Sequence, residues 1–192
     1  MRKQWFGDSR DYVKWSCVRA EAGDTFAVVY GPMLRNDSFS GEKLDQGVVD
    51  FFDRHKDFSA LSELFPAGYE HLLDIYERKK SADYFDRLAR LIRRVQNHSQ
   101  VVVFLDPDTG VAPKSGAGDE HLNHGDIRKV CELLRTGEKL IVYQHASRSE
   151  NWRKIAHEKL APLAIESRTI LSQPFYEDGT AKDVCFFTFT KS

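Results

Sequence analysis

The sequence lacks features that would place it in a membrane or outside the cell. No apolar run approaches the roughly 20 residues needed to span a bilayer, and the opening MRKQWFGDSRDY has no signal-peptide core. Its three cysteines, Cys17, Cys131 and Cys185, lie far apart and form no Cys-x-x-Cys pair. An odd number of thiols without metal spacing indicates buried thiols in a reducing compartment. We therefore expect a cytoplasmic protein with no membrane partner and no resident metal.

The sequence also lacks an excess of either charge. It has 28 Lys and Arg against 29 Asp and Glu, a formal net charge of -1. Binding to nucleic acid through overall charge is therefore excluded, and a local basic patch is needed. The candidates are the run 78–80 and the arginines Arg87, Arg90, Arg93 and Arg94. These side chains suit phosphate contacts, although a solvated helix face is the commoner arrangement.

The chain of 192 residues has no repeat, linker or low-complexity tract, which predicts one domain over 1–192. Hydrophobic patterns predict strands at 25–31, 101–105, 139–145, 169–175 and 183–190. They predict helices at 9–22, 67–80, 81–96, 125–134 and 149–163, so that 32–100 is a mostly helical covering region. Strands that are apolar on both faces alternate with helices. This pattern predicts an α/β fold, a three-layer Rossmann-like sheet with helices on both faces and a C-terminal antiparallel edge hairpin.

Three of the predicted strands end on polar or conformationally special residues: Tyr30-Gly31, 106–110 (DPDTG) and Gln144-His145. Ligands of open α/β sheets bind beyond the carboxyl ends of the strands. Proline fixes φ and glycine permits a sharp turn, so this corner presents two carboxylates rigidly. We expect a crevice with catalytic residues Asp106, Pro107, Asp108 and His145 and substrate-binding residues Thr109, Gln144 and Arg148, and Trp5 is a further candidate that could stack on a base of the substrate. The alternative is a simple turn over 108–110 capped by Asp106.

The stretch WFGDSRDYVKWSCVRA at 5–20 resembles the N-terminal motif of the methyltransferases that modify adenine in large-subunit ribosomal RNA. That motif is aromatic-x-Gly-Asn-x-x-Asp-x-x-Lys-His, matched here by Phe6, Gly7, Asp8, Asp11, Lys14 and Trp15. VFLDPDTG stands where the family has Asp-Pro-Pro-Tyr at a strand end, and LIVYQH resembles the strand that follows. The chain is also similar to a bacterial and phage branch with an Asp-Pro-Asp-(Asn/Thr)-Gly centre.

The resemblance implies a class I methyltransferase-like fold, with methyl transfer from S-adenosylmethionine to an amine of a nucleic acid or nucleotide-type substrate. It implies cofactor-binding residues Phe6, Gly7, Asp8, Lys14 and Gly31, the glycine allowing the cofactor to approach the backbone. Asp106 and the Pro107 carbonyl would accept the hydrogens of the amine. Trp5, Phe6 and Trp15 would either stack on a base of the substrate or cover the sheet edge as core aromatics. The oligomeric state is not predicted.

Two other functions fit the same residues. Asp106 and Asp108, two positions apart at a strand end, suit Mg²⁺ in a phosphatase or nuclease, with a third oxygen from Asp119 or Glu120. Alternatively, the protein is a methyltransferase-like shell that binds a nucleotide or a partner protein without catalysis. The substitution of Asp108 and Thr109 for the family's Pro-Tyr supports this alternative, because it removes the aromatic that stacks on a flipped base.

Overall fold

The computed structural model of the protein describes residues 9–33, 58–72, 74, 76, 80–112, 121–177 and 179–192. Its helices are α1 (Ser9–Ala22), the 3-10 helix η2 (Phe58–Leu64), α3 (Ser81–Gln96), α4 (His124–Leu133) and α5 (Trp152–Glu166). The strands of its main sheet are β1 (Ala27–Gly31), β2 (Tyr69–His71), β3 (Val101–Leu105), β6 (Lys139–His145), β7 (Thr169–Leu171) and β8 (Val184–Lys191). Two short strands, β4 (Gly110–Val111) and β5 (His121–Leu122), pair separately.

The main sheet has six strands in the order β2-β1-β3-β6-β8-β7. β2, β1, β3 and β6 are parallel, whereas β8 runs antiparallel to both of its neighbours. The chain leaves β1 in one direction to form β2 and then returns to the other side of β1 to form β3. The carboxyl ends of β1 and β3 therefore flank a topological switch point, which is where open α/β sheets bind ligands.

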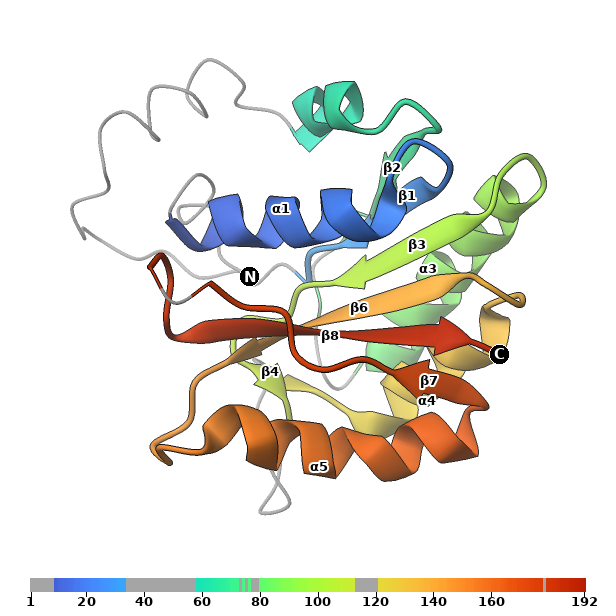
Figure 1. Cartoon of the computed structure of the whole chain (residues 1–192). Coiled ribbons are helices and arrows are strands. Elements are labelled where there is room, and N and C mark those ends of the chain that lie inside the picture. Colours follow the sequence, from blue (N-terminus) through green and yellow to red (C-terminus); the bar gives the residue numbers. More distant parts are fainter. Residues whose placement is uncertain are drawn as a thin grey trace.

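Helices cover both faces of the sheet (Figure 1). α1 packs on one face, where the Trp15 ring contacts those of Tyr30 and Phe104 and Val18 belongs to the same buried cluster. α3, α4 and α5 pack on the other face, against alternate residues of the same strands such as Val29 and Val103. All residues of β1 and β3 are buried, as expected for parallel strands covered on both sides. The predicted three-layer Rossmann-like fold with its C-terminal antiparallel hairpin is confirmed.

The helix expected over 67–80 is wrong in its first part, because Tyr69–His71 forms the edge strand β2. Tyr69 pairs with Val28, and the Leu72 N–H donates to the Tyr30 carbonyl at 3.0 Å. The edge of β1 offers backbone hydrogen-bond partners to this segment. Pairing with that edge stabilises a strand here, although the apolar residues are spaced as in a helix. Gly68, with a φ of +126°, turns the chain into this strand.

Other expectations agree closely with the structure. α3, β3 and β6 have the predicted limits, whereas α5 begins at Trp152, three residues after the expected Ser149. The three cysteines are free and buried, as expected. Among the described residues, no helix combines the length and the apolar character that crossing a bilayer requires.

Candidate functional site

A buried cluster of charged side chains lies at the carboxyl ends of β1 and β3. The Lys14 ammonium is 2.6 Å from Asp11 Oδ1 and 2.8 Å from Asp106 Oδ2. The Tyr30 hydroxyl donates a hydrogen bond of 2.7 Å to the same Asp106 oxygen. We call these four residues the Lys14 cluster. None of them is more than 4% exposed.

The Lys14 cluster is built from three elements, since Asp11 and Lys14 are on α1, Tyr30 is on β1 and Asp106 follows β3. Asp11 and Lys14 are three residues apart on α1 and therefore lie on one face of that helix. Side chains alternate along a strand, so Asp106 follows Phe104 toward the α1 face. The Asp106 N–H donates to the Gly31 carbonyl at 3.0 Å, which keeps the end of β3 beside β1. The ion pair between Lys14 and Asp106 thus lies at the switch point and links α1 to the end of β3.

Burial alone would lower the pKa of the Lys14 ammonium. The Asp106 and Asp11 carboxylates together raise it by more, so the pKa lies well above its ordinary value. The Tyr30 hydroxyl has its pKa raised by burial and then by Asp106, so it remains a hydrogen-bond donor. The Lys14 ammonium also lies 5.8 Å from the centre of the Tyr143 ring. The cluster is therefore held by a permanent positive charge between two carboxylates.

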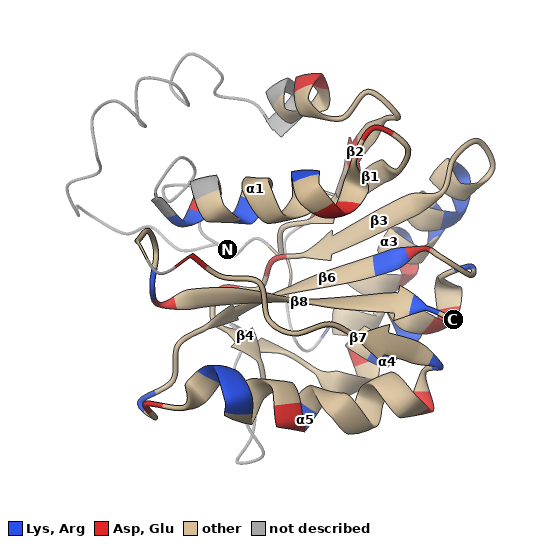
Figure 2. Cartoon of the chain, in the orientation of Figure 1, with Lys and Arg blue, Asp and Glu red and all other residues tan. Residues whose placement is uncertain are grey.

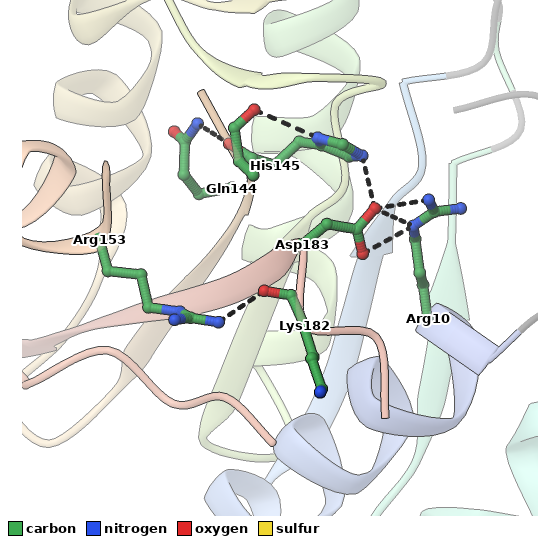
Figure 3. A network of polar contacts seen from close by, with 7 residues as sticks. Arg10, Gln144, His145, Arg153, Lys182 and Asp183 are labelled. Atoms are coloured by element: carbon green, nitrogen blue, oxygen red, sulfur yellow. Dashed lines mark hydrogen bonds and ion pairs between the residues drawn. The ribbon is translucent and has the colours of Figure 1, made fainter. Parts of the chain in front are cut away.

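A second set of contacts joins α1 to the last strand. The Asp183 carboxylate accepts hydrogen bonds from Arg10 Nη2 at 2.6 Å and Nε at 3.2 Å. His145 Nε2 lies 3.2 Å from Asp183 Oδ2, and His145 Nδ1 lies 3.4 Å from the Ala146 carbonyl (Figure 3). Burial raises the pKa of Asp183, but Arg10 lowers it more, so the pKa is below its ordinary value. We call Arg10, His145 and Asp183 the Asp183 clamp.

A cavity of about 230 Å³ opens beside the end of β6, between the β4–β5 pair and α5. Its apolar wall includes Val111, Trp152 and Leu160. Its polar lining consists of Thr109, His121, Gln144, His145, Ser147 and Lys159. The cavity thus adjoins the 106–110 corner through Thr109 and the Asp183 clamp through His145.

One wall of this cavity is fixed by Gln144. Its Oε1 accepts from the Val111 N–H at 3.0 Å, and its Nε2 donates to the His145 carbonyl at 2.8 Å. Gly110 has a φ of +109°, and a Cβ there would lie 2.7 Å from the Gln144 side chain. Glycine is therefore required at this point, where the chain turns from the corner into β4.

The structure gathers several of the residues that the sequence singled out. Pro107 is buried, Asp108 and Thr109 are half-buried, and Arg148 is exposed and outside the cavity lining. Gly31 faces Leu105 Cδ2 and the Tyr84 hydroxyl, where a Cβ would lie 3.1 and 3.2 Å away, so its small size serves packing. Trp5, Phe6, Gly7, Asp8, Asp119 and Glu120 lie outside the described residues.

Trp15 settles one of the alternatives. It is 5% exposed, and its ring lies 5.0 Å from that of Tyr30 and 5.8 Å from that of Phe104, both edge to face. It therefore covers the sheet as a core aromatic.

Sequence reasoning missed Arg10 and Asp183, because a polar residue just before a strand gives no sign of a partner on α1.

Charged residues of both signs are present along α1 and along α5 (Figure 2). On α3 the four arginines are exposed, and two of them are paired. Arg87 Nε is 3.1 Å from Asp74, and Arg94 Nη2 is 2.9 Å from Glu70. Two of these four arginines thus form ion pairs with carboxylates in or near β2.

Comparison with known proteins identifies no family. No family model matches the chain, and no curated protein matches it. Among solved structures, the selenomethionine-substituted CurJ carbon methyltransferase is similar, with a TM-score of 0.41 and 10% sequence identity. The match covers 96% of this chain and 54% of that one, so this chain spans about half its length. A likeness of this degree assigns no activity.

Proposed function

We propose that the protein transfers a methyl group from S-adenosylmethionine to an amine of a nucleic acid or nucleotide-type substrate. The supporting observation is the 2.8 Å contact between Lys14 and Asp106, residues 92 positions apart. It joins the two segments that resemble the ribosomal RNA adenine methyltransferases, and it lies at the switch point of a Rossmann-like sheet. A chance resemblance of two separate segments gives no reason for them to meet there.

In this proposal Asp106 positions the corner rather than touching the substrate. It is 2% exposed, and its Oδ2 already accepts hydrogen bonds from Lys14 and Tyr30. The hydrogens of the amine would then be accepted by the neighbouring Pro107 carbonyl and the half-buried Asp108 carboxylate. His145, held by Asp183 at the adjoining strand end, would receive the proton that the methylated amine releases.

The described residues fit direct contact with the cofactor only poorly. The Lys14 ammonium is bound by two carboxylates, and Gly31 packs against Tyr84 and Leu105. S-adenosylmethionine would supply the methyl group, and its contacts would fall to Phe6, Gly7 and Asp8, which lie outside the described residues. Lys14 would act indirectly, by holding the Asp106 carboxylate in place.

The geometry gives little support to the Mg²⁺ alternative. The Lys14 ammonium already occupies the position that a cation would need at Asp106 Oδ2. Within the described ranges, no group of three or more His, Cys, Asp or Glu side chains is arranged to hold a metal ion. We therefore propose no metal-dependent step.

The burial of Asp106 favours one second candidate, a non-catalytic methyltransferase-like protein that binds a nucleotide. Calorimetric titration of S-adenosylhomocysteine into the full chain separates the two functions, combined with transfer of a tritiated methyl group to RNA, DNA and free nucleotides. Asp108→Asn should lower transfer at least about tenfold without changing nucleoside binding. Asp86→Asn, on the exposed face of α3, is the matched control. Nucleoside binding without transfer to any acceptor would support the non-catalytic candidate, and absence of both would overturn the proposed methyl transfer.

A further inference from the structure

The cavity beside β6 has walls of two kinds. Val111, Trp152 and Leu160 form an apolar side, and Thr109, His145 and Lys159 lie on the polar side. Its volume of about 230 Å³ is below the roughly 300–1,000 Å³ of sites for drug-sized ligands. A space of this size suits one ring system with a short polar extension.

Among the described residues that line the cavity, Lys159 alone carries a permanent charge, and there is no Asp or Glu. Lys159 is exposed, and none of the described carboxylates forms an ion pair with it. An unpaired ammonium at the rim of an apolar space is suited to the anionic end of a ligand whose other end is apolar.

Lys159 also borders a second hollow of about 130 Å³, at the start of α4. That hollow is lined by His124, Arg128 and Glu166 among others. Burial lowers the pKa of His124, and the nearby Lys159 lowers it further. Arg128 and Glu166 lie 3.8 Å apart, so these two charges offset each other, and the ammonium of Lys159 borders both hollows.

The fixed polar groups of the cavity leave Lys159 as its adaptable contact. Both ends of the Gln144 amide bind the backbone, and both ring nitrogens of His145 have neighbours in the Asp183 clamp and at Ala146. The Thr109 carbonyl accepts from the His145 N–H at 3.2 Å, which ties the cavity to the 106–110 corner. A ring seated in the cavity therefore lies next to the corner assigned to methyl transfer.

We infer that this cavity binds the base of one nucleoside monophosphate unit of the substrate, with the base against Trp152 and Leu160 and the phosphate on Lys159 at the rim. The inference rests on the proposed function, for which it names the substrate class. The unit is either a free nucleotide or one nucleotide of a single strand, since both present the same base, sugar and phosphate.

The test is calorimetric titration of AMP, adenosine and a short single-stranded RNA into the full chain. AMP should bind more tightly than adenosine, and Lys159→Ala should weaken AMP binding about tenfold while leaving adenosine binding unchanged. Ser147→Trp, at the exposed rim, should weaken both ligands by obstructing the cavity. Lys154→Ala is the matched control, because Lys154 is on the same helix and outside the cavity lining.

Lys159-dependent binding of AMP would support a free nucleotide, and Lys159-dependent binding of RNA alone would support a nucleotide within a strand. The inference is overturned if neither ligand depends on Lys159, or if Lys154→Ala has the same effect. S-adenosylhomocysteine titrated in parallel separates the two proposals. Lys159-dependent AMP binding without nucleoside binding would leave the cavity assignment standing and remove methyl transfer, and the reverse result would remove only the cavity assignment.

Discussion

Lys14 is the residue on which the buried cluster depends. Lys14→Met would leave the Asp11 and Asp106 carboxylates buried without their cation, so we expect a loss of about 3–5 kcal/mol in the free energy of unfolding. Urea unfolding measures this loss directly. Lys154→Met is the control, because Lys154 is 78% exposed and its pair with Glu158 is long, at 3.9 Å. Equal effects of the two substitutions would show that the cluster does not stabilise the fold.

Asp183 makes stability depend on pH. Its pKa is lowered in the folded protein, so its contacts stabilise the fold above the ordinary aspartate pKa of about 3.9 and lose their effect as the pH falls through the folded value. Because the clamp is more than a third exposed, Asp183→Asn should cost about 1 kcal/mol or less at pH 7. Urea unfolding at pH 7 and near pH 3 should show the difference shrinking in acid. An undiminished difference at the lower pH would rule out the carboxylate charge as its source.

Individual residues were partly predictable from the sequence. Lys14 and Asp106 stood out because each belongs to a recognisable motif, and the end of a parallel strand is a known place for polar residues. Their mutual contact depends on how α1 crosses the sheet, which local patterns do not contain. The same holds for Asp183, whose partners are on α1 and β6.

At the scale of elements, the turn into β4 depends on Gly110. Gly110→Ala places a methyl group 2.7 Å from the Gln144 side chain at a positive φ, so we expect a loss of about 2 kcal/mol or more. Gly125→Ala is the matched change, because its Cβ would meet no atom within 4 Å and alanine favours the α4 helix. Thermal unfolding should show Gly110→Ala destabilised and Gly125→Ala unchanged or stabilised. Similar midpoints for both would mean that the turn can rearrange.

Elements with a clear hydrophobic period were predicted well, and those defined by their neighbours were not. α3 repeats its apolar residues at helical spacing, and β3 is a short apolar run ended by a proline corner. β2 has neither signal, since its three residues are half-buried and its pairing is decided by the edge of β1. β4 and β5 are too short to leave a pattern.

At the scale of the whole molecule, three thiols report on the integrity of the core. Cys17, Cys131 and Cys185 are at most 1% exposed, and burial raises the pKa of Cys131 and Cys185 to about 12. A thiol-reactive dye should therefore react with none of them in the native protein and with all three in denaturant. Labelling should follow the same urea dependence as the loss of helix signal. Labelling well below that transition would reveal partial opening of the sheet.

The place of β8 in the sheet has a consequence for synthesis. β8 lies between β6 and β7, although both precede it in the chain, and it begins at Val184. While the ribosome is still translating this stretch, β6 and β7 each offer an unpaired edge, and Asp183 has not yet reached Arg10. The nascent chain is therefore open to pairing with other strands until β8 emerges. The contacts of Asp183 with Arg10 and His145 can therefore form only after the chain preceding β8 has emerged.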